Sequence, residues 1–170
     1  MDALDAILTR RSIRRYTAKA VPGEVTRMLL EAAMSAPSAG NEQPWHFVLI
    51  TERRLLDAIP AFHPYADMLR EAPLAILVCG DLALERYEGC WVQDCSAATQ
   101  NLLLAAHANG LGAVWVGIHP EEDRVRRMRK LLGLPAHVIP LALVPVGYPG
   151  ERFPPAHRFD ATRVHTNGWP

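Results

Sequence analysis

Arginines near the N-terminus are the first side chains whose types and spacing suggest chemistry. Arg10, Arg11, Arg14 and Arg15 surround Ser12 within six positions. Guanidinium groups present planar donor forks that match phosphate oxygens, and each charge-assisted hydrogen bond contributes about 1.5–3 kcal/mol. Cations at a helix C-terminus also offset the helix dipole while they remain in water. Taken alone, the cluster is compatible with a phosphate site and with an ordinary helix end.

A second polar stretch, residues 36–47, reads A-P-S-A-G-N-E-Q-P-W-H-F. Its two prolines and its glycine prevent a continued helix, so the backbone must form an irregular turn. Ser38, Asn41 and Gln43 place short polar side chains and backbone N–H groups on that turn. These groups suit a flat polar ligand, although an Asx-type loop between a helix and a strand has the same composition.

The two stretches together resemble a known pair of motifs. R-R-S-I-R-R-Y (10–16) followed by P-S-A-G-N-E-Q-P-W (37–45) is similar to the signature of the FMN-dependent nitroreductase family. The similarity extends to a long helix rich in small residues, to G-L-G-A-V-W (110–115) and to a late basic segment, A-H-R-F-D (156–160). It therefore covers nearly the whole chain.

The resemblance implies roles for the arginines. Arg10, Arg11 and Ser12 would hold the phosphate of FMN, and Arg14 would lie nearer the pyrimidine edge of the ring, where negative charge develops on reduction. A cation at that edge is one way for a protein to tune a flavin. Arg158 matches a late basic position that reaches the phosphate, and Arg152 is a weaker candidate.

The resemblance also implies a homodimer with each flavin site at the subunit interface. The second motif would contact the flavin of the other subunit through four residues, Pro37, Ser38, Ala39 and Asn41. Residues 43–45 would continue the motif structurally without binding the cofactor. Val116 and Gly117, at a strand end, would place backbone groups near the reactive part of the ring.

A dinucleotide fold is excluded. The run G-L-G-A-V-W-V-G (110–117) follows a predicted helix and enters a strand, the reverse of the order that a Rossmann fingerprint requires. Nicotinamide would instead stack directly on the flavin, as the resemblance implies.

Aromatic side chains offer candidates for a flat substrate pocket, namely Phe62, Tyr65 and Trp91, although aromatics on short elements are more often core residues. Seven histidines are scattered without a metal-ligand spacing, so no metal site is predicted. The position of His107 on the long helix favours a core or interface role for this residue.

Composition limits the class of protein. The 170 residues are 49% hydrophobic and 21% charged, which is typical of one globular domain. Eighteen basic and eighteen acidic residues cancel, so no overall field favours nucleic acid or an anionic membrane. Three cysteines without C-x-x-C spacing, no apolar run long enough to span a membrane and no signal core in residues 1–11 predict a cytoplasmic protein.

Periodicity predicts helices at 4–11, 25–36, 53–59, 91–109 and 121–130, with a helical turn near residue 68. Strands are predicted at 45–51, 74–80, 112–118 and 139–147, the last at a sheet edge or irregularly paired because of Pro140 and Pro145. These elements favour an α+β fold, and the resemblance implies a nitroreductase-like three-layer α/β/α sandwich with a mainly antiparallel central sheet. Residues 1–148 would form the single domain. Residues 149–170, rich in proline and poor in aliphatic side chains, would form an extended C-terminal arm on the body or on a partner subunit.

The resemblance implies an FMN-dependent oxidoreductase that uses NAD(P)H to reduce nitroaromatic, quinone or similar flat acceptors by a ping-pong hydride mechanism. No side chain is predicted to be catalytic, because the cofactor carries the chemistry. Larger members of the family have a helical excursion where this chain has only Gly80–Cys90, so a more open flavin face is expected. Three alternatives remain: a flavin-consuming enzyme, a reductive dehalogenating enzyme and a non-catalytic flavin-binding protein.

Overall fold

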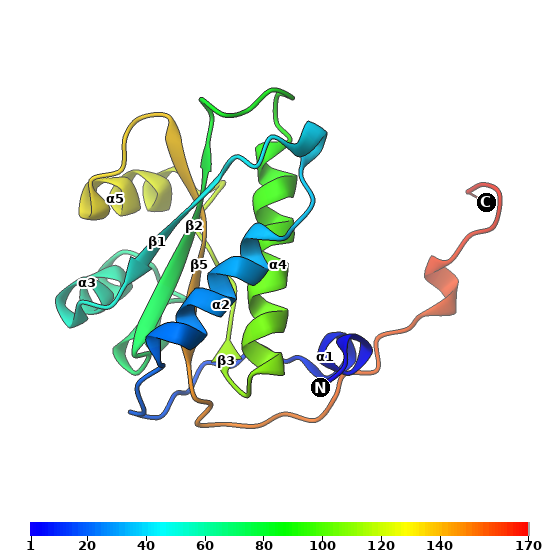
Figure 1. Ribbon diagram of the computed structural model, residues 1–170, viewed down its shortest axis with the longest axis horizontal. Helices are drawn as coiled ribbons and strands as arrows, with labels where there is room; N and C mark the ends of the chain where they lie inside the picture. The colour runs from blue at the N-terminus through cyan, green and yellow to red at the C-terminus, as the bar shows by residue number, and fades with distance from the viewer. Residues whose placement is uncertain (170) are drawn as a thin grey trace.

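The computed structural model of the chain describes residues 1–169 and has three layers (Figure 1). Its central sheet has the strand order β1-β2-β5-β3, with β4 also paired to β5, and every pairing is antiparallel. The strands are β1 (Trp45–Ile50), β2 (Leu74–Asp81), β3 (Gly112–Ala113), β4 (Val116–Gly117) and β5 (Val138–Gly147). The predicted three-layer α/β/α sandwich with an antiparallel sheet is confirmed.

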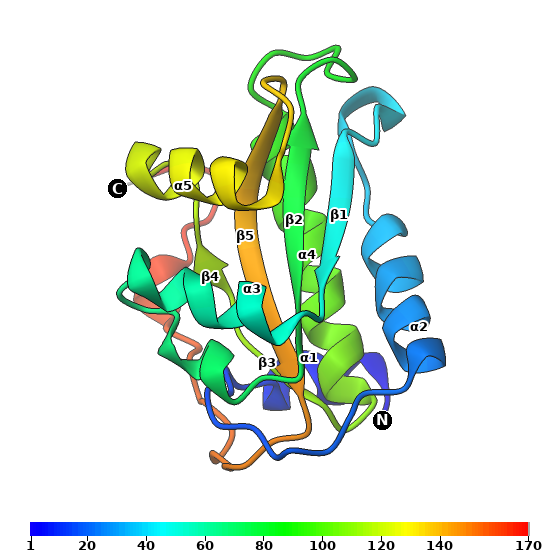
Figure 2. The same ribbon diagram turned by 90° about the vertical axis from the view of Figure 1, so that its left-hand side faces the viewer.

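Helices cover both faces of the sheet (Figure 2). One face carries α2 (Gly23–Met34) and α4 (Trp91–Ala108), and the other carries α3 (Arg53–Ala58) and α5 (Glu122–Leu132). The short helix α1 (Ala3–Thr9) lies beside the C-terminal end of α4 (Figure 1). Single 3₁₀ turns occupy the connections, at Ala39–Asn41, Ile59–Ala61, Asp67–Arg70 and Ala161–Arg163. In the described chain, no helix is both long and apolar enough to cross a membrane.

The predicted edge position of β5 is wrong, because β5 lies inside the sheet between β2 and the short strands β3 and β4. Its two prolines are accommodated by irregularities in the neighbouring strands. Pro140 pairs with Cys79, where the register of β2 shifts, so the predicted irregular pairing is found there. Pro145 lies opposite the break between β3 and β4, which splits the single strand predicted at 112–118 into two. Each proline of β5 therefore has an irregular stretch of a neighbouring strand beside it, where a missing backbone N–H breaks no regular ladder.

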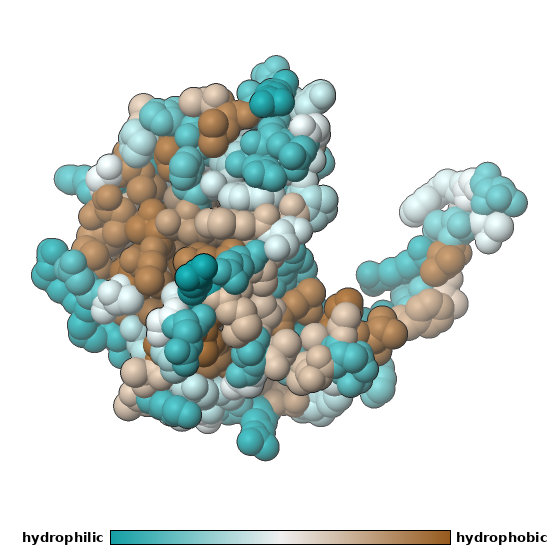
Figure 3. All heavy atoms as spheres, in the orientation of Figure 1, coloured by the Kyte–Doolittle hydropathy of each residue, from teal (hydrophilic) through white to brown (hydrophobic). Residues whose placement is uncertain are grey.

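The C-terminal segment leaves the body after β5. Its first residues lie against the N-terminal segment: Pro149 forms a β-bridge with Tyr16, and the N–H of Gly150 donates to the carbonyl of Arg15 at 2.7 Å. The following residues extend away from the body and expose hydrophobic side chains (Figure 3), among them Phe159, Val164 and Trp169. Pro170, the last residue of the predicted arm, lies outside the described residues.

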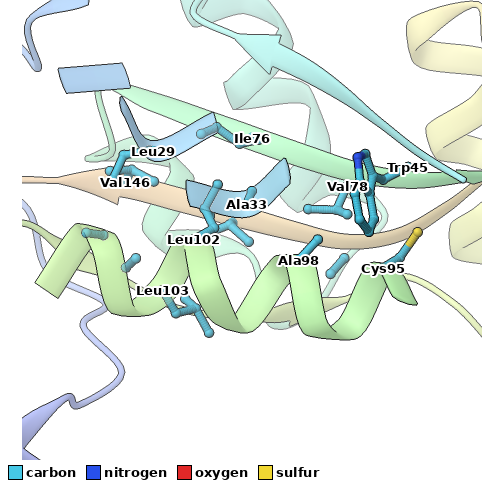
Figure 4. Close-up of a cluster of buried hydrophobic side chains, with 14 of the residues drawn as sticks. Leu29, Ala33, Trp45, Ile76, Val78, Cys95, Ala98, Leu102, Leu103 and Val146 are labelled. Atoms are coloured by element: carbon cyan, nitrogen blue, oxygen red, sulfur yellow. The ribbon is translucent and has the colours of Figure 1, made fainter. Parts of the chain in front are cut away.

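Two hydrophobic clusters hold the layers together, one on each face of the sheet. In the first (Figure 4), Leu29 and Ala33 of α2 meet Ala98 and Leu102 of α4 above β2. The alanines let the two helices approach closely, and burial of each leucine contributes about 1.5–3 kcal/mol. Since β2 is buried along its whole length, the sheet is a rigid support for the residues at its ends.

Candidate functional site

The N-terminal arginines lie on an extended segment that buried neighbours hold in place. After α1 ends at Thr9, the N–H of Ile13 donates to the carbonyl of Ala113 at 3.1 Å, and the hydroxyl of Tyr16 donates to the carbonyl of Ile13 at 2.7 Å. Ile13 and Tyr16 are buried, whereas Arg14, between them, is exposed. The anchors therefore point inward and Arg14 points outward along this segment.

Glu151 ties this segment to the chain that follows β5. Its carboxylate accepts hydrogen bonds from the backbone N–H of Arg14 at 2.5 Å and of Arg15 at 3.2 Å. The Arg15 guanidinium forms an ion pair with Glu71 at 2.9 Å. In residues 1–169, by contrast, no carboxylate lies within ion-pair distance of Arg10, Arg11 or Arg14. These are three of the arginines that the resemblance assigns to the cofactor.

Arg10, Arg11 and Arg158 bring three positive charges together. Burial lowers the pKa of Arg10, and the nearby charges of Arg158 and Arg11 lower it further. Arg11 donates to the carbonyl of Pro154 at 2.5 Å and lines a cavity of about 390 Å³ that Arg152 also lines. Like charges that crowd in this way are relieved by a bound anion, so the residues present fit a phosphate group.

A second cavity, of about 280 Å³, brings together residues from distant parts of the sequence. Arg14, Tyr65, Val116 and Gly117 all line it, as predicted candidates from three different segments. A Cβ atom built on Gly117 would meet nothing within 4 Å, so the strand end faces open space. The cavity can therefore accept a flat group against the backbone of β4.

The proline-bounded turn is tightly constrained by local contacts. Gly40, Asn41 and Gln43 all have positive φ angles, of 50°, 57° and 48°. The N–H of Gln43 donates to the Ser38 hydroxyl at 3.0 Å, and the Gln43 side chain donates to Asn41 Oδ1 at 3.0 Å. A Cβ on Gly40 would lie 2.3 Å from the ring of Tyr87, so that ring packs directly on the turn. The turn is a preformed surface, and the hydrogen bonds of Gln43 hold its backbone in place.

Two buried carboxyl groups fasten this turn to the rest of the chain. Glu42 Oε2 accepts from the N–H groups of Arg86 at 2.6 Å and Tyr87 at 3.1 Å, and Asp94 Oδ1 accepts from the N–H of Ala39 at 3.0 Å. The other oxygens, Glu42 Oε1 and Asp94 Oδ2, are buried with no other hydrogen-bond partner in the part of the chain that the structure describes. Burial raises the pKa of Asp94, and its hydrogen bond with Glu42 and the Glu42 charge raise it further. Burial therefore favours the protonated form of Asp94.

The turn and the arginines lie at opposite ends of α4. Ala39 is bonded to Asp94 in the first turn of α4, whereas Thr9, next to Arg10, contacts His107 Nε2 in its last turn at 2.8 Å. At 1.5 Å per residue, these two contacts are separated by roughly 20 Å along the helix. Within one chain, the turn and the arginines therefore do not line one site.

The three aromatic candidates do not share a pocket within the chain. Tyr65 lines the cavity of Arg14, but Phe62 lies against α5, and Trp91 lies in a different cavity beside His119. Trp91 is buried, and its ring packs directly on Gly80. Phe62 is half-buried against the hydrophobic cluster on one face of the sheet, and Trp91 is buried in the cluster on the other.

The histidines include one that the sequence did not single out. His63 is 1% exposed and lines the Arg14 cavity together with Arg124 of α5. His107 instead contacts Thr9, and burial and the charge of Arg10 lower its pKa, in keeping with a structural role. Among residues 1–169, no three His, Cys, Asp or Glu side chains are grouped so as to hold a metal ion.

Comparisons with known proteins agree with this fold. The family model described as the nitroreductase family matches residues 7–63 and 61–148. A protein from Methanothermobacter thermautotrophicus, provisionally named NADH dehydrogenase/NAD(P)H nitroreductase, is 52% identical over 169 residues, which cover 99% of this chain and 88% of that protein. A crystal structure with the same provisional name, from Bacteroides thetaiotaomicron, has a TM-score of 0.94 and 46% identity and covers 98% of both chains. A provisionally named nitroreductase from Desulfovibrio desulfuricans, in complex with FMN, has a TM-score of 0.85 and 35% identity, with 100% of this chain and 99% of that chain covered.

Proposed function

The chain belongs to the nitroreductase family, and on that basis we propose that it is an FMN-dependent oxidoreductase that takes hydride from NAD(P)H and reduces flat acceptors such as nitroaromatic compounds and quinones. The observation that carries the proposal is the gathering of Arg10, Arg11 and Arg158 without a carboxylate partner among residues 1–169. Such a gathering is costly unless an anion is bound, and the phosphate of FMN is an anion of the right chemistry.

The residues divide the cofactor between them. Arg10, Arg11, Ser12 and Arg158 would hold the phosphate, Arg14 would lie near the pyrimidine edge of the ring, and Val116 and Gly117 would lie near its reactive part. FMN, when bound, supplies the hydride chemistry, and the protein supplies position, charge and exclusion of water. Because NAD(P)H and the acceptor use the same open face in turn, the expected kinetics are ping-pong.

A homodimer completes each site in this proposal. The turn Pro37–Asn41 lies about 20 Å along α4 from the arginines of its own chain, so it reaches a flavin only in a second subunit. Exposed hydrophobic side chains support such an interface: Leu4, Ile7 and Leu8 on α1, and Phe159, Val164 and Trp169 in the C-terminal segment. Isolated monomers rarely leave so many large apolar side chains on adjoining segments uncovered.

The location of the protein is proposed from its thiols. Cys79, Cys90 and Cys95 are all free, and burial raises the pKa of Cys79 and of Cys95 to about 12. Three unpaired cysteines suit a reducing compartment, and we place the enzyme in the cytoplasm.

The experiment is reconstitution of the apoprotein with FMN, followed by steady-state assays with NADH or NADPH and a quinone. Arg10→Ala is expected to raise the dissociation constant for FMN by about 10- to 150-fold, the loss of one charge-assisted hydrogen bond. Arg27→Ala is the matched control, because Arg27 pairs with Glu31 on the surface of α2. Failure of the wild-type protein to bind FMN would overturn the proposal. Binding without NAD(P)H turnover would instead favour a flavin-consuming enzyme, a dehalogenating enzyme or a non-catalytic flavin carrier.

A further inference from the structure

The carbonyl of Gly117 is held from two sides. His63 Nε2 lies 2.8 Å from this oxygen, and Arg124 Nη1 donates to it at 3.3 Å. Since a carbonyl only accepts, His63 must carry its proton on Nε2. Its Nδ1 accepts the N–H of Tyr65 at 3.3 Å, so the ring is the neutral tautomer with both nitrogens in use.

The surroundings keep this imidazole neutral. Burial lowers the pKa of His63 and the charge of Arg124 lowers it further, while the hydrogen bond to Gly117 opposes both effects. Arg124 in turn lies over the ring of Tyr65, with its guanidinium carbon 5.7 Å from the ring centroid. The Gly117 carbonyl therefore meets two fixed donors, one neutral and one cationic.

The direction of the Gly117 N–H follows from the strand pairing. The N–H of Ile118 donates to the carbonyl of Leu141 in β5 at 3.0 Å. In an antiparallel ladder, successive residues turn their N–H and C=O groups to opposite sides, and both groups of one residue point the same way. The N–H and the C=O of Gly117 thus both point away from β5, toward the open edge of β4 and the cavity that Gly117 lines.

The charged side chains that line this cavity are all positive. Arg14 and Arg124 both line it, and none of its lining residues is acidic. A ligand that gains negative charge there is stabilised more than its neutral form.

We propose that His63 and Arg124 are positioning and tuning residues of the flavin site. His63 fixes the Gly117 peptide so that its N–H donates to an acceptor atom on the pyrimidine side of FMN, and Arg124 adds a second positive charge to that of Arg14. This inference rests on the proposed function, since it assigns residues to the same cofactor.

The first test uses two substitutions of the histidine. His63→Leu removes the donor to Gly117, and His63→Gln keeps an N–H donor of similar reach. Titration of each apoprotein with FMN is expected to give a dissociation constant about tenfold above that of the wild type for His63→Leu and within about twofold for His63→Gln. His137→Gln, at an exposed histidine distant in sequence from the site, is the control. An unchanged constant in His63→Leu, or an equal loss in His63→Gln, would refute the positioning role.

The second test does not depend on a buried substitution. Arg124→Ala is expected to weaken binding of reduced FMN about tenfold more than binding of oxidised FMN, which lowers the two-electron midpoint potential by about 30 mV. Arg127→Ala, on the same helix but paired with Asp123 at 2.8 Å, should leave the potential unchanged. Equal potentials in Arg124→Ala and the wild type would refute the tuning role. The outcomes that would refute the positioning role or the tuning role differ from a failure of the proposed function, in which the wild-type protein itself would not bind FMN.

Discussion

Substitution of Asp94 tests how the proline-bounded turn is held. Asp94→Asn retains an oxygen for the N–H of Ala39 and gains an amide that can donate to Glu42, whereas Asp94→Ala removes both contacts. Comparison of the two variants therefore separates the effect of the Asp94 hydrogen bonds on stability from the effect of its titration.

The expected magnitudes follow from the buried groups. Asp94→Ala leaves the N–H of Ala39 without its acceptor, at a cost of about 1–3 kcal/mol. For a domain of this size, each kcal/mol lowers the melting temperature by about 2–4 °C. Asp94→Asn should lose little stability at acidic pH.

The pH dependence has a definite sign. The pKa of Asp94 is raised in the folded protein, so the native state binds an additional proton between the unfolded value of 3.8 and the raised folded value. The stabilisation is fully present below pH 3.8 and is lost as the pH rises through the folded pKa, where the buried Asp94 becomes charged. The free energy of unfolding of Asp94→Asn should therefore exceed that of the wild type above this window, by about 1–3 kcal/mol.

The assay is urea unfolding of the wild type, Asp94→Asn and Asp94→Ala at a series of pH values from 4 to 8, followed by circular dichroism. A difference between Asp94→Asn and the wild type that stays constant across the series would refute the raised pKa of Asp94. Equal stability of Asp94→Ala and the wild type would show that the contact to Ala39 does not hold the turn.

Three further predictions concern other parts of the molecule. Gly117→Val should fold with a melting temperature within about 2 °C of the wild type, because its side chain enters open space. Titration of this variant should show at least tenfold weaker FMN binding, and unchanged binding would contradict the assignment of Gly117 to the site. A thiol reagent at pH 8 should modify Cys90 well before Cys79 or Cys95, whose pKa burial raises to about 12, and mass spectrometry of the peptides would detect a different order. Removal of residues 157–170 should raise the dimer dissociation constant in the absence of FMN, as measured by analytical ultracentrifugation, and an unchanged constant would exclude the arm from the interface.

Much of the fold could be predicted because local patterns and packing agree. Local patterns predicted the strand β2 at 74–80 and the long helix α4 at 91–109. The position of β5 could not be predicted, since a proline excludes a regular ladder only when the neighbouring strands are regular too. Here the break between β3 and β4 accommodates Pro145, and that break has no local sequence signal.

Part of the candidate site could not be predicted from the sequence either. The arginine cluster and the turn were visible because their residue types are concentrated in short stretches. His63 and Arg124 were missed, because each is an isolated polar residue whose role depends on contact with Gly117 across the fold. Asp94 had one weak signal, an acidic residue in the first turn of a helix, but its partner Glu42 is 52 positions away.

The most direct test of the account is flavin binding by a mixed dimer. One subunit carries Arg10→Ala with Arg14→Ala, the other carries Ser38→Ala with Asn41→Ala, and different affinity tags isolate the heterodimer. If each site takes its arginines from one subunit and its turn from the other, one site has all the substitutions and the other has none. The account predicts one FMN per heterodimer bound with wild-type affinity, while neither mutant homodimer reaches that affinity. A heterodimer with no site of wild-type affinity would contradict it, because each site would then be built within a single subunit.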